Sequence, residues 1–324
     1  MIQLENICKT YTVKTLKQGK LLSYNKKEIH ALTDVSFSVA PGESVGYVGL
    51  NGSGKSTTIK ILAGILNADS GRIRVNGRDP FLDKEHRKTI GAVFGQHQQL
   101  WIDLPVQDSF QMLRYIYSVP KEEFSRRLQE INSFLNLEPL LAMPSRKLSL
   151  GQRMKCEFAA SLLHGPKLLL LDEPTIGIDI QTRKSVMDLI THLNRQYGVT
   201  IFLTTHNLSD IETVCGKIII IDSGSVIYQG DQAEFLKANQ DIKKLRIETA
   251  ESVTPEQAAQ FSTAECAVSG ISDTRLEITY PADRIGSALD LVDRIRQTYR
   301  VQAIAAQERS LENVINDLYE KTGR

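Results

Sequence analysis

The segment SVGYVGLNGSGKSTTIKILAGIL, residues 44–66, contains the pattern that determines the fold. Its apolar start, Val45 to Val48, is typical of a buried strand. The next eight residues, Gly49 to Ser56, fit G-x-x-x-x-G-K-[ST], the phosphate-binding loop. Apolar residues then recur at helical spacing up to Leu66, which predicts a helix. Because strand, glycine loop and helix occur in the required order, we interpret the match as functional rather than as a chance glycine-rich turn.

The residue types in this loop suit a phosphate ligand. Glycines allow backbone N–H groups to converge on phosphate oxygens, and the helix N-terminus adds its dipole. Lys55 is expected to reach the β- and γ-phosphates, and the Ser56 hydroxyl to ligate Mg²⁺. The expected nucleotide-binding residues of the loop are Gly49, Asn51, Gly52, Ser53, Gly54, Lys55, Ser56 and Thr57.

A second motif, KLLLLDEPTIGID, occupies residues 167–179. Leu168 to Leu171 are apolar at every position, as in a central parallel strand covered on both faces. Asp172 and Glu173 follow at the carboxyl end, where open α/β sheets place ligands. Asp172 suits the Mg²⁺ shell, and Glu173 is placed to polarise a water that attacks the γ-phosphate. A solvated acidic turn is the alternative, but it does not usually accompany a phosphate-binding loop.

Two further segments are ambiguous when each is taken alone. LSLGQRMKCEFAASLLHGP, residues 148–166, predicts an amphipathic helix capped by Ser149. TIFLTTHNLSD, residues 200–210, is a β-rich strand that ends at His206. By itself, His206 is better explained as a structural histidine.

In this order, the four motifs resemble those of the nucleotide-binding subunit of an ABC (ATP-binding cassette) transporter, over about residues 1–236. The resemblance implies an α/β fold, a P-loop NTPase cassette with a mixed-sheet core, an antiparallel β subdomain and a helical subdomain at about 97–164. It also implies ATP and Mg²⁺ as cofactors and Mg²⁺-dependent ATP hydrolysis as the activity.

The resemblance assigns roles to the signature segment. Ser149, Gly151 and Gln152 match the family's LSGGQ, which contacts the γ-phosphate of an ATP held by the partner subunit. Leu150 departs from that pattern and removes some backbone freedom, so a looser contact is expected. Tyr11 is similar to the aromatic residue that stacks on adenine, with a packed strand tyrosine as the alternative.

Three more residues are assigned in the same way. Gln96 resembles the glutamine that senses Mg²⁺ and the γ-phosphate, and His206 the histidine that holds the γ-phosphate. Asp179 matches the acid of the loop that crosses between subunits, although IGID stands where the family more often has SALD. The expected catalytic residues are Glu173, His206 and Gln96, and the expected metal ligands are Ser56, Gln96 and Asp172.

The chain's one tryptophan, Trp101, lies in the polar stretch FGQHQQLWIDLP, residues 94–105. In the family, this segment forms much of the groove that receives a short helix of the membrane subunit. Tryptophan is enriched at interface hot spots, so we expect Trp101 to contact a membrane partner, with a core tryptophan as the alternative. The basic segment 14–27 is equally consistent with a solvated hairpin loop and with a patch for acidic lipid headgroups.

Residues 241–324 show a different pattern, in which strands and helices alternate as βαββαβ. This order predicts a small α+β, ferredoxin-like domain. Thr254, Pro255 and Gln257 predict a capped helix start within it. No nucleophile, metal cluster or phosphate loop occurs there, so a regulatory or dimerising domain is expected.

Composition limits the possible partners. The 324 residues carry a net charge of +1, so no global basic field exists and nucleic acid is not expected as a partner. The cysteines are far apart in sequence, which favours reduced thiols. The start MIQLENICKT predicts no signal peptide, and no apolar run approaches the ~18 residues of a membrane span.

The expected function is therefore an ATP-hydrolysing subunit that powers a membrane transporter by ATP-driven dimer closure. Export is the favoured direction, because one exporter branch of the family has a similar basic insertion. Its expected partners are integral membrane permease subunits and a second ATP-binding subunit, a homodimer, at the cytoplasmic face of the membrane. The alternative is a soluble ABC ATPase acting on ribosomes or nucleic acid. One phosphate loop, and the short distance from Gln96 to Ser149, argue against that alternative.

Overall fold

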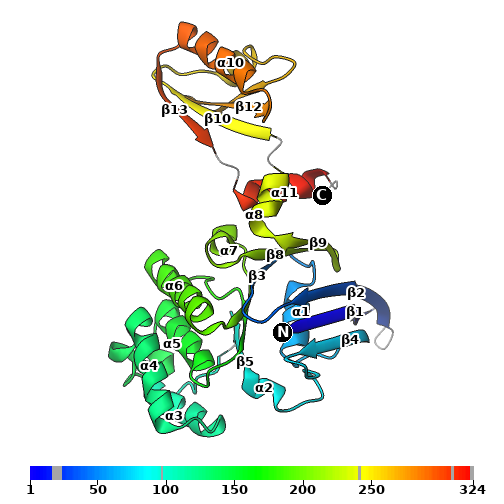
Figure 1. The fold of residues 1–324 in the computed structure, drawn as a ribbon, viewed down its shortest axis with the longest axis vertical. Helices are drawn as coiled ribbons and strands as arrows, with labels where there is room; N and C mark the ends of the chain where they lie inside the picture. Colours follow the sequence, from blue (N-terminus) through cyan, green and yellow to red (C-terminus); the bar gives the residue numbers. More distant parts are fainter. Residues whose placement is uncertain (17–23, 96–97, 240–241, 308–309, 322–324) are drawn as a thin grey trace. The chain divides into compact units, whose positions relative to one another are not determined.

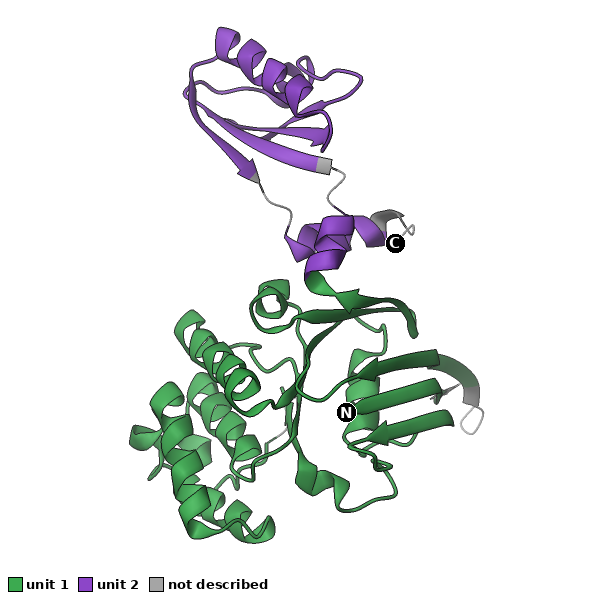
Figure 2. Cartoon of the chain, in the orientation of Figure 1, with its two compact units in different colours: residues 1–232 green, residues 233–324 purple. Residues whose placement is uncertain are grey.

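The computed structural model describes residues 1–16, 24–95, 98–239, 242–307 and 310–321. The chain forms two compact units, Met1–Gln232 and Ala233–Arg324 (Figures 1 and 2). Each unit has its own hydrophobic core, and each is therefore described by itself. Among the described residues, no helix is long and apolar enough to cross a membrane.

A six-stranded mixed sheet forms the centre of the first unit. In spatial order its strands are β5 (Ile90–Phe94), β6 (Leu168–Asp172), β7 (Thr200–Thr204), β3 (Ser44–Val48), β8 (Lys217–Asp222) and β9 (Ser225–Asp231). All neighbouring pairs are parallel except β8 and β9. The carboxyl ends of β3, β6 and β7 consequently lie at one edge, which brings the loops that follow them together.

An antiparallel sheet of three strands packs into the same core. Its strands, in spatial order, are β2 (Tyr24–Val39), β1 (Ile2–Leu16) and β4 (Ser70–Val75). The β1–β2 hairpin continues beyond β4, which pairs only with the part of β1 up to Cys8. Residues 14–16 and 24–27 of the predicted basic segment lie on this extension, and residues 17–23 are outside the described part of the chain.

The helix after the phosphate-binding loop is shorter than predicted. α1 spans Lys55–Leu62, whereas the apolar spacing predicted a helix that continued to Leu66. Gly64 has a φ of +68°, and a Cβ at this position would lie 1.9 Å from the carbonyl oxygen of Pro80. The chain therefore turns away from the helical path where the loop containing Pro80 passes close to it.

The predicted helical subdomain contains three α-helices. They are α3 (Val106–Ile116), α4 (Lys121–Leu135) and α5 (Leu150–Leu162). The predicted apolar face of α5 is buried. The remaining α-helices of this unit are α2 (His86–Thr89), α6 (Ile180–Tyr197) and α7 (Leu208–Val214).

Side chains cover the open edge of the central sheet at β5. His164 Nε2 donates to the carbonyl oxygen of Ile90 at 2.9 Å, and Gln99 Nε2 donates to that of Ala92 at 2.6 Å. Both carbonyls belong to an edge strand, whose outward groups would otherwise lack partners. The edge is thus closed by residues of the helical subdomain and of the segment that leads into it.

The second unit contains a four-stranded antiparallel sheet. Its elements are α8 (Gln232–Ala238, which begins at the last residue of the first unit), β10 (Ile242–Thr249), α9 (Pro255–Ala259), β11 (Ala267–Ser272), β12 (Arg275–Pro281), α10 (Ile285–Thr298), β13 (Val301–Gln307) and α11 (Leu311–Lys321). The spatial order is β11-β12-β10-β13. From β10 to β13 the elements follow the order of a split βαβ fold, and Thr254 and Gln257 form the capping box at α9.

Candidate functional site

The loop between β3 and α1 places its backbone close to neighbouring chain segments. Gly54 adopts a φ of +109°, and a Cβ there would lie 2.6 Å from the carbonyl oxygen of Ala31. Gly49 is equally confined, because its Cβ would lie 2.3 Å from Ser53 Oγ. No side chain caps the N-terminus of α1. Its first N–H groups can therefore bind an anionic ligand, as in other phosphate-binding loops.

Lys55 is held within this loop. Its Nζ donates to the carbonyl oxygens of Gly49 at 2.6 Å and Leu50 at 3.1 Å. Burial lowers the pKa of Lys55, while the carboxylates of Glu173 and Asp172 raise it. The ammonium group therefore lies where a phosphate would add favourable charge.

Asp172, at the end of β6, lies beside Ser56 of the loop. Its Oδ1 accepts a hydrogen bond from Thr204 Oγ1 at 2.7 Å and one from Ser56 Oγ at 3.4 Å. The described residues contain no cluster of three or more His, Cys, Asp or Glu side chains for a metal. Mg²⁺ commonly takes one or two protein oxygens and completes its shell with phosphates and water, and this pair fits that pattern.

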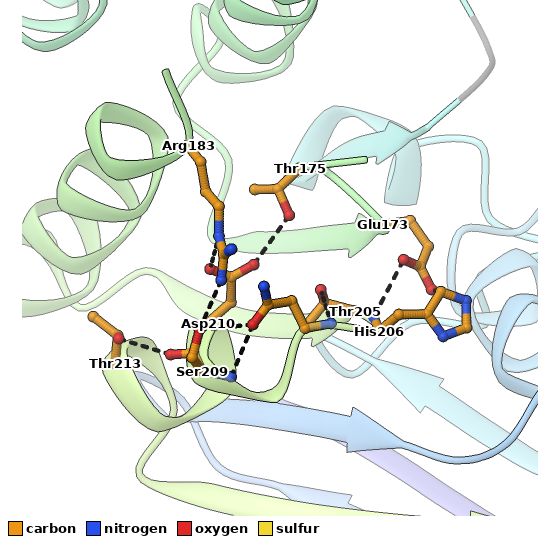
Figure 3. A network of polar contacts seen from close by, with 9 residues as sticks. Glu173, Thr175, Arg183, Thr205, His206, Ser209, Asp210 and Thr213 are labelled. Carbon is orange, nitrogen blue, oxygen red and sulfur yellow. Dashed lines mark hydrogen bonds and ion pairs between the residues drawn. The ribbon is translucent and has the colours of Figure 1, made fainter. Parts of the chain in front are cut away.

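Glu173 and His206 contact each other across neighbouring strand ends (Figure 3). Glu173 Oε1 lies 3.0 Å from His206 Nε2, and Glu173 Oε2 accepts the His206 backbone N–H at 3.3 Å. Glu173 has a φ of +56°, an uncommon left-handed conformation for a non-glycine residue. Its backbone N–H is fixed by the carbonyl oxygen of Thr204 at 3.0 Å. Strained backbone of this kind is concentrated at functional sites.

A buried aspartate, Asp210, fixes the loop after β6 through hydrogen bonds. Asp210 is 3% exposed and accepts hydrogen bonds from Arg183 Nε at 2.7 Å and Thr175 Oγ1 at 3.0 Å (Figure 3). Arg183 Nη2 also donates to Ser209 Oγ at 2.8 Å. The network joins α6, α7 and the loop after β6. No local pattern in the sequence predicts this network, because Asp210 and its arginine partner lie 27 positions apart.

The signature residues form a second cluster. Ser149 caps α5 in a reciprocal capping box with Gln152, as Ser149 Oγ accepts the Gln152 N–H at 3.3 Å and Gln152 Oε1 accepts the Ser149 N–H at 3.0 Å. A Cβ on Gly151 would lie 3.4 Å from Asp179 Oδ2. Asp179 caps α6 through the Thr182 N–H at 2.9 Å, and this hydrogen bond lowers the pKa of Asp179. Ser149, Gly151, Gln152 and Asp179 therefore lie together.

The two departures from the family motifs lie against each other. Leu150 replaces a glycine of the signature, and Gly177 occupies the alanine position of SALD. A Cβ on Gly177 would lie 2.8 Å from Leu150 Cδ2. Leu150 remains 44% exposed, so this face of the molecule presents an apolar side chain beside the signature serine.

Two predicted site residues remain, Tyr11 and Gln96. Tyr11 Oη lies 3.5 Å from Thr57 Oγ1 with its side chain 38% exposed, so it borders the loop and is not a core tyrosine. Gln96 lies outside the described residues. The chain that leads to it is anchored beside the site, because the Gly95 N–H donates to the Asp172 carbonyl oxygen at 3.0 Å.

Trp101 is not buried. It is 36% exposed, and the next residue, Ile102, is 50% exposed. A separate open groove of about 500 Å³ lies at the β5 edge, with Phe81, Gln99 and His164 among its lining residues. Trp101 is therefore available to a partner rather than packed in the core.

The sequence profile of the ABC transporter family matches residues 32–176. The methionine import ATP-binding protein MetN of Geobacillus kaustophilus is 32% identical over 71% of the chain and 66% of its own length. The linearmycin resistance ATP-binding protein LnrL of Bacillus subtilis is 33% identical over 72% of the chain and 70% of its own length. The chain thus spans about two thirds of these relatives.

Solved structures show the same arrangement of elements. A dimeric ATP-binding cassette in a post-hydrolysis state, bound to ADP and Pi, matches with a TM-score of 0.60 and 26% identity. The match covers 71% of this chain and 98% of that one. The family match includes Lys55, Asp172, Glu173 and Ser149, whereas Asp179 and His206 follow its last residue.

Proposed function

This chain belongs to the ABC transporter family and is an ATP-binding subunit with an ATPase cassette fold, and from that premise we propose that it supplies the Mg²⁺-dependent ATP hydrolysis of a membrane transporter. The observation that carries the proposal is the contact between Glu173 and His206 at 3.0 Å. This pair lies at the strand ends beside Lys55 and Asp172.

Each residue of the first cluster has a chemical role in this proposal. Lys55 and the N-terminus of α1 bind the β- and γ-phosphates of ATP. Ser56 and Asp172 hold Mg²⁺, which neutralises charge on the phosphates. Glu173 accepts a proton from the attacking water, and His206 donates a hydrogen bond to the γ-phosphate while orienting Glu173. Positioning and charge stabilisation supply most of the catalysis of phosphoryl transfer.

A second subunit completes each site in this proposal. Within the described residues, no hydrogen bond or ion pair links the signature cluster to Lys55, Ser56 or Glu173. Ser149 and Gly151 then serve the ATP of a partner cassette. The similar solved cassette is described as dimeric, which supports a symmetric pair of two copies with two ATP molecules between them.

The partner that Trp101 contacts is proposed to be an integral membrane permease, with this chain bound at the cytoplasmic face. Exposed Trp101 offers an aromatic anchor, and the open groove at β5 is a separate candidate site for a short helix. Trp101→Ala should lower the coupling of transport to ATP turnover and leave nucleotide binding unchanged. Transport at wild-type efficiency in that variant would remove Trp101 from this role.

Export is the proposed direction. The basic segment 14–27 and the likeness to a resistance protein support it, whereas the likeness to methionine import proteins supports uptake as the second candidate. Inverted membrane vesicles distinguish the two, because their cassettes face added ATP. An exporter fills such vesicles with its substrate when ATP is added, and an importer releases substrate preloaded into them.

The experiment that tests the function is an affinity purification of Glu173→Gln protein from its native membranes after trapping with ATP. A stoichiometric protein with several membrane spans is expected to co-purify. A Lys55→Ala variant, which should not bind ATP, serves as the matched control for nucleotide dependence. Recovery of a soluble homodimer, or of ribosomes or nucleic acid, would contradict the transporter and leave the ATPase chemistry in place.

A further inference from the structure

A carboxylate buried in α5 holds the chain just after Gln96. Glu157 is 3% exposed. Its Oε2 accepts the backbone N–H of Gln99 at 2.7 Å, and its Oε1 accepts that of Leu100 at 3.4 Å. A buried carboxylate requires donors of this kind, and removing it would leave two backbone N–H groups unsatisfied. The roles proposed above for ATP hydrolysis do not use Glu157.

Gln99 connects Glu157 to the central sheet. Its side-chain Nε2 donates to the carbonyl oxygen of Ala92 at 2.6 Å, on the open edge of β5, while its main chain is held by Glu157. The same residue therefore bonds the core sheet through its side chain and the signature helix through its backbone. Gln99 is thus one of the residues that join these two parts of the cassette, together with His164.

The segment is fixed at its other end beside the nucleotide site. The Gly95 N–H is bonded to the Asp172 carbonyl oxygen, so only residues 96–98 lie between that anchor and the bond from Gln99 to Glu157. Gln99 is therefore only four positions along the chain from the anchor at Gly95. α5 is a continuous helix from Leu150 to Leu162, so a displacement at Glu157 also reaches its N-terminus at Ser149.

We propose that Glu157 is a positioning residue that transmits the nucleotide state of the site, through Gln99 and Leu100, to the signature serine of the same subunit. The inference rests on the proposed function, because it assigns Gln96 and Ser149 to successive nucleotide contacts. Glu157 touches neither ATP nor the attacking water. It acts by holding α5 in a fixed position relative to residues 99 and 100, which follow the phosphate site in the chain.

Hydrogen exchange of backbone amides tests the proposal directly, because the groups in question are amides. The experiment compares Glu173→Gln protein with and without Mg²⁺ and ATP, with Glu157 intact, changed to Ala or changed to Gln. With Glu157 intact, ATP should slow exchange in residues 98–104 and in the first turn of α5. In the Ala variant, residues 99 and 100 should exchange about tenfold faster, and the response of α5 to ATP should vanish.

Kinetics on the Glu173-intact protein supply the second readout. Glu157→Ala should lower kcat by about tenfold and leave KM for ATP within about threefold, because the site for ATP itself is unaltered. Glu157→Gln retains one acceptor oxygen and should recover part of the loss. If the Ala variant does not fold, the Gln variant carries the same comparison with a smaller effect.

Glu130→Ala is the matched control. Glu130 lies in α4 of the same subdomain and accepts hydrogen bonds from His192 Nε2 at 2.8 Å and Tyr197 Oη at 2.6 Å. This variant should lose stability and keep both the response of α5 and kcat. A response of α5 that persists in Glu157→Ala, or that is lost equally in Glu130→Ala, overturns the inference. Absence of ATP binding to Glu157-intact protein would instead overturn the proposed function, and the inference with it.

Discussion

At the scale of single residues, Glu173 is constrained both in its backbone and in its side chain. It combines a left-handed backbone with a contact to His206. Glu173→Gln should reduce ATP hydrolysis by about 10² to 10⁴-fold, because an amide cannot accept the proton of the attacking water. ATP binding should remain, since Lys55 and the loop are unchanged. Phosphate release and nucleotide affinity are the measurements, with the exposed Glu122→Gln as the control for loss of one charge. Turnover at the wild-type rate would exclude Glu173 as the base.

His164 gives a second prediction at this scale, in the pH dependence of stability. Burial lowers the pKa of His164 to about 4, so the ring is neutral in the fold and charged below about pH 6.5 in the unfolded chain. The unfolded state therefore binds more protons between these values, and stability falls as the pH falls through this window. The contribution between pH 7 and pH 5 is about 2 kcal/mol.

His164→Gln tests this, because glutamine can still donate to the Ile90 carbonyl oxygen but cannot titrate. Denaturation followed by the fluorescence of Trp101, the chain's single tryptophan, reports on the first unit. The variant should lose less stability than wild type between pH 7 and pH 5. Equal losses in the two proteins would show that His164 is not the titrating group. Burial also lowers the pKa of His86, so only the difference between the two proteins is assigned to His164.

At the scale of elements, Asp210 ties α6 to α7 through Arg183. Asp210→Asn leaves the arginine without its buried carboxylate and should destabilise the cassette by about 3 kcal/mol. kcat should also fall, since the same network supports the loop after Glu173 and the turn after His206. Chemical denaturation and ATPase assays measure the two effects.

The matched control for this variant is an ion pair on the surface. Asp103 pairs with Arg146 at 3.2 Å, and both side chains are more than half exposed. Asp103→Asn should change stability by less than about 1 kcal/mol, because solvent screens such pairs. If both variants lost the same stability, the buried position of Asp210 would not account for its effect.

The sequence predicted best those features that depend on residues close to one another in the chain. The strand–loop–helix order around Lys55, the helix cap at Ser149 and the capping box at Thr254 involve residues only a few positions apart, and the structure shows them as predicted. The ends of elements were less predictable. α1 stops early because Pro80, which is distant in sequence, lies against Gly64.

Contacts between elements were the least predictable part of the site. The bonds of Glu157 to residues 99 and 100 and of Asp210 to Arg183 join positions 58, 57 and 27 apart in the chain. The first two bonds join a helix to a loop and the third joins two helices, and each depends on how the fold brings distant segments together. No periodicity or turn signal in the sequence reports such a pair.

At the scale of the whole molecule, two separate cores predict two unfolding transitions. Calorimetry should resolve one transition for each unit, and Trp101 fluorescence should follow only that of Met1–Gln232. Mg²⁺ with ATP at 100 times its dissociation constant should stabilise this transition by about 2.7 kcal/mol and leave the other unchanged. A single transition that moves as a whole with ATP would contradict the independence of the two cores.

The closeness of Leu150 and Gly177 affects how these two positions can change in evolution. The two positions lie in different motifs, yet a methyl group on one would fall 2.8 Å from the side chain of the other. An ancestor with the common alanine could accept leucine in the signature only with a shift of that side chain, whereas an ancestor that already had glycine could accept it freely. Gly177 also has a φ of +72°, which by itself disfavours a side chain at this position. Relatives that carry leucine at the first position are therefore expected to carry glycine at the second.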